Sequence, residues 1–311
     1  MNRVGIALLV AVAGLSTSLA AQNGSAPFHV EGRGEYDSLQ AAVDAIGDGE
    51  GTVTIAPGTY RQCAVQTAGR VTFRAATPGR VILDSQTCED KAALVLRGRA
   101  STVDGLVFQN MRVPDANGAG IRMEKGDLLV RETLFRDSEQ GILAADDPSG
   151  TITITRSTFS NLGRCDRGLS CAHGIYVNAI GKLTVRESRF EKGAGGHYLK
   201  SRSPRIELVD SSFDDSAGRG TNYHIDLPNG ATGRIAGNRF VQGRDKENYS
   251  ALITVAVEGK VNPSAGLAIV GNEATLAPGA KPTVFVADAS GERLAIGPNR
   301  LGPGVTATER R

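Results

Sequence analysis

Tryptophan is absent from this 311-residue chain, and aromatic residues make up only 5% of it. Such a chain cannot fill a large interior with bulky side chains, so its core must come from regular stacking of aliphatic groups. The 39 glycines, together with abundant valine, isoleucine, threonine and serine, fit that need. This composition favours a repetitive β architecture over a conventional mixed globule.

The chain also has little net charge, formally +2. Nucleic-acid readers usually carry a concentrated basic face, and here the only local one surrounds Lys200 and Arg202. We therefore expect no nucleic-acid partner.

Only one stretch is strongly hydrophobic, and it lies at the start of the chain. Met1–Ala21 has a charged residue at Arg3, an apolar run over Val4–Leu15 and small residues before Ala21. This pattern is typical of a secretory signal peptide, and the run is short for a membrane span. An uncleaved anchor is the alternative. We expect a mature chain that is periplasmic or secreted, without membrane association and monomeric.

A repeated strand ending in phenylalanine organises the middle of the chain. Its members end at Phe135, Phe159, Phe190, Phe213 and Phe240, at intervals of 24, 31, 23 and 27 residues. These intervals bracket one coil of a β-solenoid. A small polar residue stands two positions before each phenylalanine, and this column predicts an internal hydrogen-bonded ladder: Thr133, Ser157, Ser188, Ser211 and Asn238.

The start of this array resembles a known family. Residues 37–46 have the apolar spacing of a short amphipathic helix, with Asp37 or Ser38 as N-cap. A strand and the segment Ala56-Pro-Gly-Thr-Tyr-Arg-Gln62 follow. This opening resembles right-handed parallel β-helix proteins of the pectin-lyase-like group. The resemblance implies an all-β, single-domain right-handed parallel β-helix over residues 22–301, capped by the helix. Residues 302–311 are predicted to be a frayed polar tail.

The four cysteines fit an exported protein. Cys165 and Cys171 enclose a short loop, whereas Cys63 and Cys88 lie one coil apart. We predict that each pair forms a disulfide. A four-cysteine metal site is the alternative, but the spacing that such sites need is absent.

Functional groups are concentrated in three successive rungs between Ala172 and Pro228. Strand side chains alternate between faces, so an inner aliphatic column alternates with an outer polar one. The predicted inner column is Ile142, Ile175, Leu199, Ile225 and Ile253. The predicted outer positions of the three rungs are Tyr176, Asn178, Lys200, Arg202 and Asp226. Two insertions that break the period, 161–172 and 242–250, flank these rungs.

A non-functional interpretation of these residues is also open. The charged residues can form cross-strand ion pairs on a solvated sheet, and a single histidine at a turn is usually structural. What favours a site is the convergence of tyrosine, lysine, arginine, aspartate and three histidines in three rungs.

A second, shorter resemblance suggests the chemistry. Gly196-His-Tyr-Leu-Lys-Ser201 resembles the Lys-Ser strand of the alginate lyase and chondroitinase B group of β-helix lyases. The resemblance implies β-elimination on an acidic polysaccharide, with Lys200 as the base. No counterpart of that group's calcium-holding Asn/Glu/Glu cluster stands out, so no cofactor or metal is predicted and Ca²⁺ lacks support.

The remaining roles follow from the chemistry of elimination. Arg202 neutralises the uronate carboxylate and lowers the pKa of Lys200, while Tyr176, His197 or His224 protonates the leaving oxygen. The predicted substrate-binding residues are Asn178, His173, His224, Asp226 and Arg122.

Two other functions share the same fold. A glycoside hydrolase needs two carboxylates around one bond, and Asp226 lacks an evident partner in the sequence. A non-catalytic glycan-binding or structural β-helix is the third alternative. A groove along the Tyr176–Lys200–Asp226 face, and the chemistry of any product ends, discriminate among them.

Overall fold

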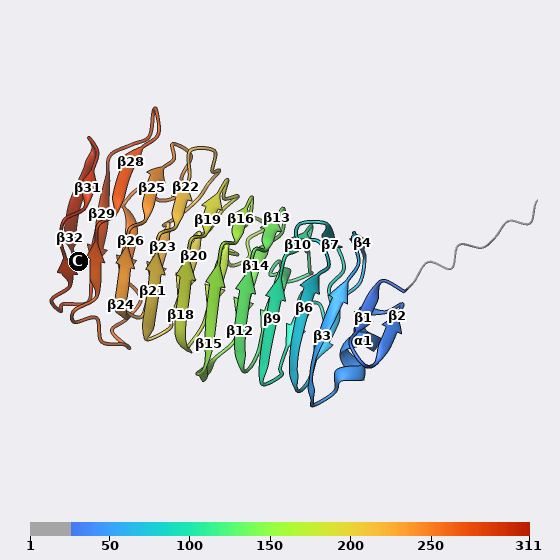
Figure 1. Ribbon diagram of the computed structural model, residues 1–311. Helices are drawn as coiled ribbons and strands as arrows, with labels where there is room; N and C mark the ends of the chain where they lie inside the picture. The colour runs from blue at the N-terminus through green and yellow to red at the C-terminus, as the bar shows by residue number, and fades with distance from the viewer. Residues whose placement is uncertain (1–25) are drawn as a thin grey trace, which may run out of the picture.

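The computed structural model describes residues 26–311, which form an elongated coil of three parallel β-sheets (Figure 1). The predicted signal peptide, residues 1–21, lies outside the described residues. Each turn of the coil contributes one strand to each sheet, and each strand pairs with its equivalents in the coils before and after. The predicted parallel β-helix is confirmed by this topology.

Sheet A has 12 strands, and the first two belong to an antiparallel hairpin. Its order is β2 (Gly34–Tyr36), β1 (Phe28–Val30), β3 (Glu50–Ile55), β6 (Arg70–Ala75), β9 (Ala100–Asp104), β12 (Asp127–Arg131), β15 (Asp147–Thr155), β18 (Ile180–Arg186), β21 (Arg205–Val209), β24 (Thr232–Ala236), β27 (Ala268–Val270) and β30 (Ala295–Ile296).

Sheet B has 10 strands. Its order is β4 (Gly58–Tyr60), β7 (Val81–Asp84), β10 (Leu106–Gln109), β13 (Leu134–Arg136), β16 (Thr158–Ser160), β19 (Arg189–Glu191), β22 (Ser212–Asp214), β25 (Arg239–Gln242), β28 (Glu273–Leu276) and β31 (Arg300–Leu301).

Sheet C also has 10 strands and carries the predicted site. Its order is β5 (Ala64–Gln66), β8 (Ala92–Leu96), β11 (Ala119–Met123), β14 (Gln140–Ala144), β17 (Ile175–Val177), β20 (Leu199–Ser201), β23 (Ile225–Leu227), β26 (Ala251–Val255), β29 (Thr283–Asp288) and β32 (Val305–Arg310).

The helix α1 (Leu39–Ile46) covers the N-terminal end of the coil (Figure 1). Ser38 is its N-cap, and the backbone N–H of Ala41 donates to the Ser38 hydroxyl. Leu39, Val43 and Ile46 are buried against the first coil. The helix therefore shields the apolar interior that the first coil would otherwise expose, as predicted.

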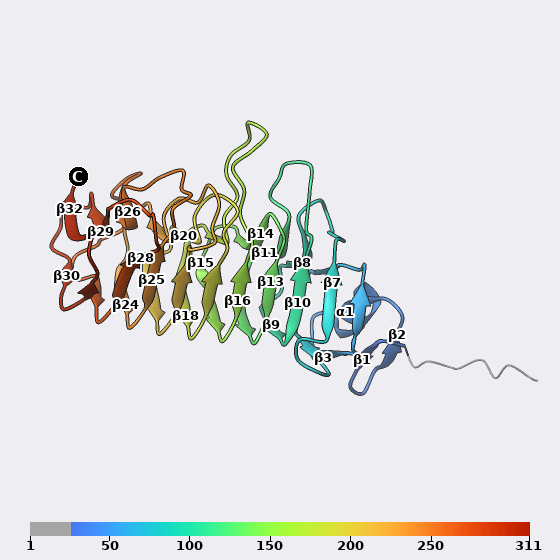
Figure 2. The same ribbon diagram turned by 90° about the horizontal axis from the view of Figure 1, so that it is seen from above.

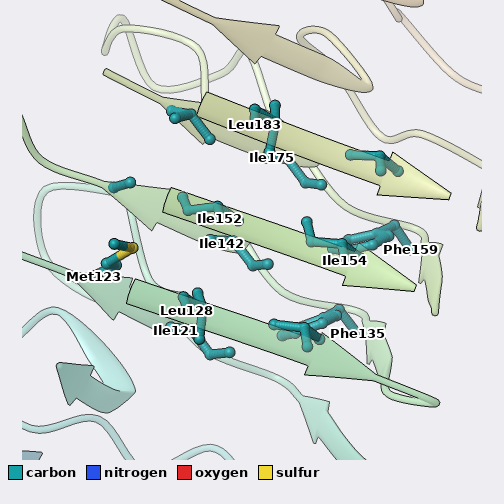
Figure 3. Packing of buried hydrophobic residues seen from close by; sticks show 14 of the residues in the cluster. Ile121, Met123, Leu128, Phe135, Ile142, Ile152, Ile154, Phe159, Ile175 and Leu183 are labelled. Carbon is teal, nitrogen blue, oxygen red and sulfur yellow. The ribbon is translucent and has the colours of Figure 1, made fainter. Parts of the chain in front are cut away.

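Aliphatic and aromatic columns fill the interior. The predicted column Ile142, Ile175, Leu199, Ile225 and Ile253 is confirmed, because each residue pairs in register with the next. Figure 3 shows Ile121, Ile142 and Ile175 stacked in this way, with Phe135 and Phe159 beside each other in sheet B. The phenylalanine rings stack from Phe108 to Phe240 with centroid separations of 4.5–5.1 Å.

The predicted polar ladder is also confirmed. The backbone N–H of Thr133 donates to the Ser157 hydroxyl, and the same contact recurs from Ser157 to Ser188 and from Ser188 to Ser211. The ladder continues from Ser211 to Asn238 and on to Asn272. It satisfies buried backbone donors at the corner between sheets A and B, where no sheet partner is available.

The C-terminal segment differs from the prediction of a frayed tail. β32 pairs in parallel with β29, from Thr283↔Val305 to Asp288↔Arg310. Its side chains are mostly exposed, so polarity alone suggested a loose end. The free edge of β29 nevertheless offers backbone partners that a sequence pattern does not reveal.

Both predicted disulfides, Cys63–Cys88 and Cys165–Cys171, are present.

Replacing Cys63 and Cys88 by serine is expected to lower the free energy of unfolding by about 3.5 kcal/mol. The same change at Cys165 and Cys171 is expected to lower it by about 2 kcal/mol. The difference arises because a disulfide that closes a longer loop removes more conformational entropy from the unfolded chain. Urea denaturation of both double variants measures the difference. An equal loss in the two would contradict a loop-length effect.

Candidate functional site

The predicted outer column of sheet C has the expected register. Leu143 pairs with Tyr176, Tyr176 with Lys200, Lys200 with Asp226 and Asp226 with Thr254. Neighbouring strands in a sheet lie about 4.8 Å apart, so these side chains form one continuous row. Inserted turns flank the row, and Figure 2 shows long connections rising from one side of the coil.

Lys200 lies at the centre of an ionic cluster. Its ammonium group is 3.1 Å from Asp226 Oδ2 and also contacts the carboxylate of Glu258. Glu258 in turn accepts a hydrogen bond from Arg202. Glu258 therefore holds both cations of the site with one carboxylate.

These contacts determine the charge of Lys200. Burial lowers the pKa of Lys200, but Asp226 and Glu258 outweigh burial and bring the pKa above its ordinary value. The expectation that Arg202 lowers this pKa is contradicted, because the nearest charges are carboxylates. Lys200 is thus held as a cation in this arrangement.

Asp226 is buried beneath the cluster, with 1% of its surface exposed. Burial raises the pKa of Asp226, an effect that the Lys200 ammonium and the Thr254 hydroxyl partly offset. Thr254 donates to Asp226 Oδ1 at 2.7 Å, while Lys200 and His197 approach Oδ2. Asp226 therefore anchors Lys200 from below.

Tyr176 stands beside the two cations and is half-buried. Its hydroxyl oxygen accepts a hydrogen bond from Arg202 Nε at 3.1 Å. The Lys200 ammonium and the Arg202 guanidinium lie 5.9 and 6.0 Å from the centre of its ring. Both cations therefore lie against the ring of Tyr176, and Arg202 is further fixed by the side chain of Asn229.

The histidines form a stacked column at the turn before sheet C. The rings of His173 and His197 are 4.7 Å apart, and His197 stacks on Tyr223. Nδ1 of His173 accepts the backbone N–H of His197, and Nδ1 of His197 accepts that of Tyr223. Burial holds the pKa of both histidines well below the ordinary value, so each is neutral with its proton assigned to Nε2.

Neither histidine serves as a base, because a neutral imidazole with Nδ1 occupied and Nε2 protonated cannot accept a proton. Nε2 of His197 lies 3.5 Å from Asp226 Oδ2, so His197 helps to position that carboxylate. The ring of His173 contacts the Tyr176 ring edge-on and supports that ring.

His224 is not part of the cluster, and its predicted contact with substrate needs correction. Its side chain is fully buried, stacks on Tyr198 and lies edge-on to Phe213 and Phe240. The chain bends at His224 immediately before β23. Strict alternation between faces fails at that bend, and the side chain enters the interior.

Arg122 and Asn178 also lie apart from the cluster. Leu143 separates Arg122 from Tyr176, and the Arg122 guanidinium lies 3.6 Å from Glu124, within a network that includes Lys91 and Arg97. The amide of Asn178 donates to the carbonyl of Ala144. Both side chains serve the scaffold here.

The residue that sequence reasoning missed is Glu258. It follows β26 in the turn that leads to sheet A, 58 residues from Lys200. The one sequence feature that could have pointed to Glu258 is the presence of an acidic residue in the turn after the Thr254 rung. The Glu258 side chain reaches back across two rungs to Lys200, and strand periodicity does not predict such a contact.

A separate buried network ties the second insertion to the preceding coil. Lys246 and Asp215 form an ion pair at 3.0 Å with both side chains fully buried. Asp215 also accepts hydrogen bonds from Tyr198 and Thr221. This network fixes the turns that lie behind the histidine column.

One group among residues 26–311 has the composition of a metal site: Cys165, Cys171 and Glu247. The two cysteines are joined in a disulfide, so neither offers the thiolate that binds metals. Glu247 instead contacts the disulfide loop, which joins the two insertions. Within the same residues, no helix has the length and apolarity needed to cross a bilayer.

The fold and its site define a parallel β-helix with a polar row on one sheet. The family model for the right handed beta helix region matches residues 92–275, and the protein belongs to this family. The pectin methylesterase from Aspergillus niger has a similar crystal structure, with 14% identity, a TM-score of 0.44 and coverage of 88% of this chain and 90% of that chain. No conclusion about activity follows from that likeness. No curated protein matches the chain significantly.

Proposed function

We propose that this protein is a carbohydrate-active enzyme that cleaves a uronate-containing polysaccharide by β-elimination. The observation that supports this most directly is the carboxylate of Glu258, bound by both Lys200 and Arg202 beside the Tyr176 hydroxyl. Two cations that already share one carboxylate are suited to bind that of a uronate. Such neutralisation is what makes the adjacent C5 proton acidic enough to remove.

Tyr176 is the proton-transfer residue in this proposal. In its deprotonated form, with Arg202 Nε donating to its oxygen, Tyr176 takes the C5 proton, and the electron pair left behind forms the C4–C5 double bond. The bond from C4 to the glycosidic oxygen breaks, and Tyr176 returns the proton to that oxygen. Lys200, first assigned as base from the Lys-Ser resemblance, instead binds the carboxylate, since its two carboxylate neighbours keep it charged.

We propose that the enzyme acts outside the cytoplasm. Both cysteine pairs are disulfide-bonded, and such bonds persist mainly in oxidising compartments. The signal-like residues 1–21 agree with export. Fractionation of the producing cells tests this location, with the protein expected in the periplasm or the medium. Peptide mapping without reduction is expected to show both disulfides in that fraction.

Glycoside hydrolysis is the second candidate, because Glu258 supplies the carboxylate partner for Asp226. Both contact Lys200 Nζ, so their nearest oxygens are at most about 5.6 Å apart, the sum of the two contacts. Retaining hydrolases use carboxylates roughly 5–5.5 Å apart. However, Asp226 is 1% exposed and its oxygens are engaged by Thr254 and Lys200. Elimination is therefore favoured.

Replacing Glu258 with glutamine tests the carboxylate-binding role of the cations. We expect the affinity for a short uronate oligomer to rise several-fold, because the internal carboxylate no longer competes for Lys200 and Arg202. Titration calorimetry with galacturonate and mannuronate oligomers measures this change. Glu35→Gln, at an exposed position of β2 at the opposite end of the coil, controls for the loss of one negative charge.

A different result would reverse the preference between the two reactions. If Glu258→Gln abolishes cleavage without tightening binding, Glu258 belongs to a catalytic carboxylate pair. In that case hydrolysis becomes the better description.

A further inference from the structure

A cleft lies at the turns between sheets B and C, which lead into the strands of the candidate site. Its volume is about 430 Å³, and its charged and amide lining includes Arg112, Glu139, Asn161, Arg164, Arg167 and Arg219. The disulfide-closed insertion 161–172 forms one part of its wall. Gly195, also in the lining, lies in the same turn as His197, two residues before it.

The cleft runs along the axis of the coil. Its lining comes from five successive turns, starting with the β10–β11 turn that carries Arg112 and ending with the β22–β23 turn that carries Arg219. Four intervals of about 4.8 Å give a length of roughly 19 Å. This shape fits a linear chain better than a compact small molecule.

Two of the four arginines are already neutralised. Arg167 pairs with Glu139 at 2.7 Å, and Arg164 bonds Asp166 and the carbonyl of Ser170 within the insertion. These contacts shape the wall. They leave little positive charge for a ligand.

Arg112 and Arg219 are different, because both are exposed and lack an acidic partner. Arg112 donates to the carbonyl of Met111, and Arg219 donates to the amide oxygen of Asn161, each at 3.0 Å. Within residues 26–311, neither has a carboxylate within 4.0 Å. They come from the first and the last of the five turns, so two free guanidinium groups mark the two ends of the cleft.

We propose that this cleft is a binding subsite for a linear acidic carbohydrate, whose carboxylate or sulfate groups pair with Arg112 and Arg219. Guanidinium groups bind such anions through paired hydrogen bonds. Among the described residues, the lining has no aromatic side chain, and stacking on aromatics is how proteins hold single-stranded nucleic acids. Assigning the ligand as the substrate chain rests on the proposed function, but binding to the cleft does not require turnover.

The double variant Arg112→Gln/Arg219→Gln tests this subsite. The probes are a galacturonate disaccharide, long oligogalacturonates, sulfated heparan oligomers and single-stranded DNA, with affinity measured by titration calorimetry. We expect affinity for one class of long acidic oligosaccharide to fall on the order of tenfold, with weaker salt dependence and an unchanged disaccharide affinity. The charge-matched control is Arg234→Gln/Arg239→Gln, because these arginines are exposed on sheets A and B.

Three outcomes would overturn the subsite. The control variant could lose as much oligosaccharide affinity as the cleft variant, or the cleft variant could lose none. The protein could also bind no acidic oligosaccharide while the cleft variant loses affinity for DNA alone. Product analysis with the same polymers keeps the two proposals apart. Binding that depends on the cleft without any cleavage would remove the lyase proposal and leave the subsite intact.

Discussion

Replacing Tyr176 with phenylalanine is expected to lower turnover of the acidic polysaccharide on the order of 10²–10⁴-fold, the usual contribution of a positioned acid–base group. The variant removes only the hydroxyl that accepts the Arg202 hydrogen bond. The ring remains to pack against His173. Initial rates from the absorbance of unsaturated uronate measure the loss.

Substrate binding should change little in Tyr176→Phe, since Lys200 and Arg202 still neutralise the carboxylate. The matched control is Tyr36→Phe, at a hydroxyl that bonds the Arg33 carbonyl near the N-terminal end. Undiminished turnover in Tyr176→Phe would remove this residue from proton transfer. A changed unfolding midpoint would instead identify a structural role.

The second large effect is expected on stability. Replacing Lys246 with methionine leaves the fully buried carboxyl group of Asp215 without its cation. Breaking a buried ion pair from one side typically costs about 3–5 kcal/mol of unfolding free energy. Burial already lowers the pKa of Lys246, which reflects the cost of its desolvation. Urea denaturation and amide exchange over residues 215–222 measure the effect.

A double variant separates charge from packing. Lys246→Met/Asp215→Asn removes both charges and is expected to recover part of the lost stability. An unchanged midpoint and unchanged exchange in Lys246→Met alone would mean that the pair does not hold the second insertion in place.

Most of the fold could be predicted from the sequence because each coil repeats the same local demands. An aliphatic residue at the Ile175 position and a phenylalanine at the Phe159 position recur once per coil, and stacking these columns requires parallel, in-register strands. The polar ladder through Ser188 recurs for the same reason. The end of the chain escaped prediction because β32 has little apolar pattern and is stabilised by backbone pairing with β29.

The candidate site could be predicted only in part. Alternation along the strands put Tyr176, Lys200 and Asp226 in one row, and the register agrees. Side-chain alternation applies to strands and not to turns, so it could not predict that Glu258 reaches the row from the turn after β26. For the same reason, the prediction that His224 faces outward was wrong, because His224 lies in the turn before β23. The charge of Lys200 depends on Glu258 and therefore could not be inferred either.

The chemistry of the new chain ends is the most direct test of elimination at this site. Mass spectrometry of products from a panel of alginate, polygalacturonate and glycosaminoglycans distinguishes the possibilities. We expect the wild-type protein to yield, from one of these polymers, oligomers with an unsaturated uronate at the new non-reducing end, each lighter by one water than the hydrolysis product. Saturated ends on every cleaved polymer would contradict the account, as would the absence of cleavage across a panel that includes the polymer the protein binds.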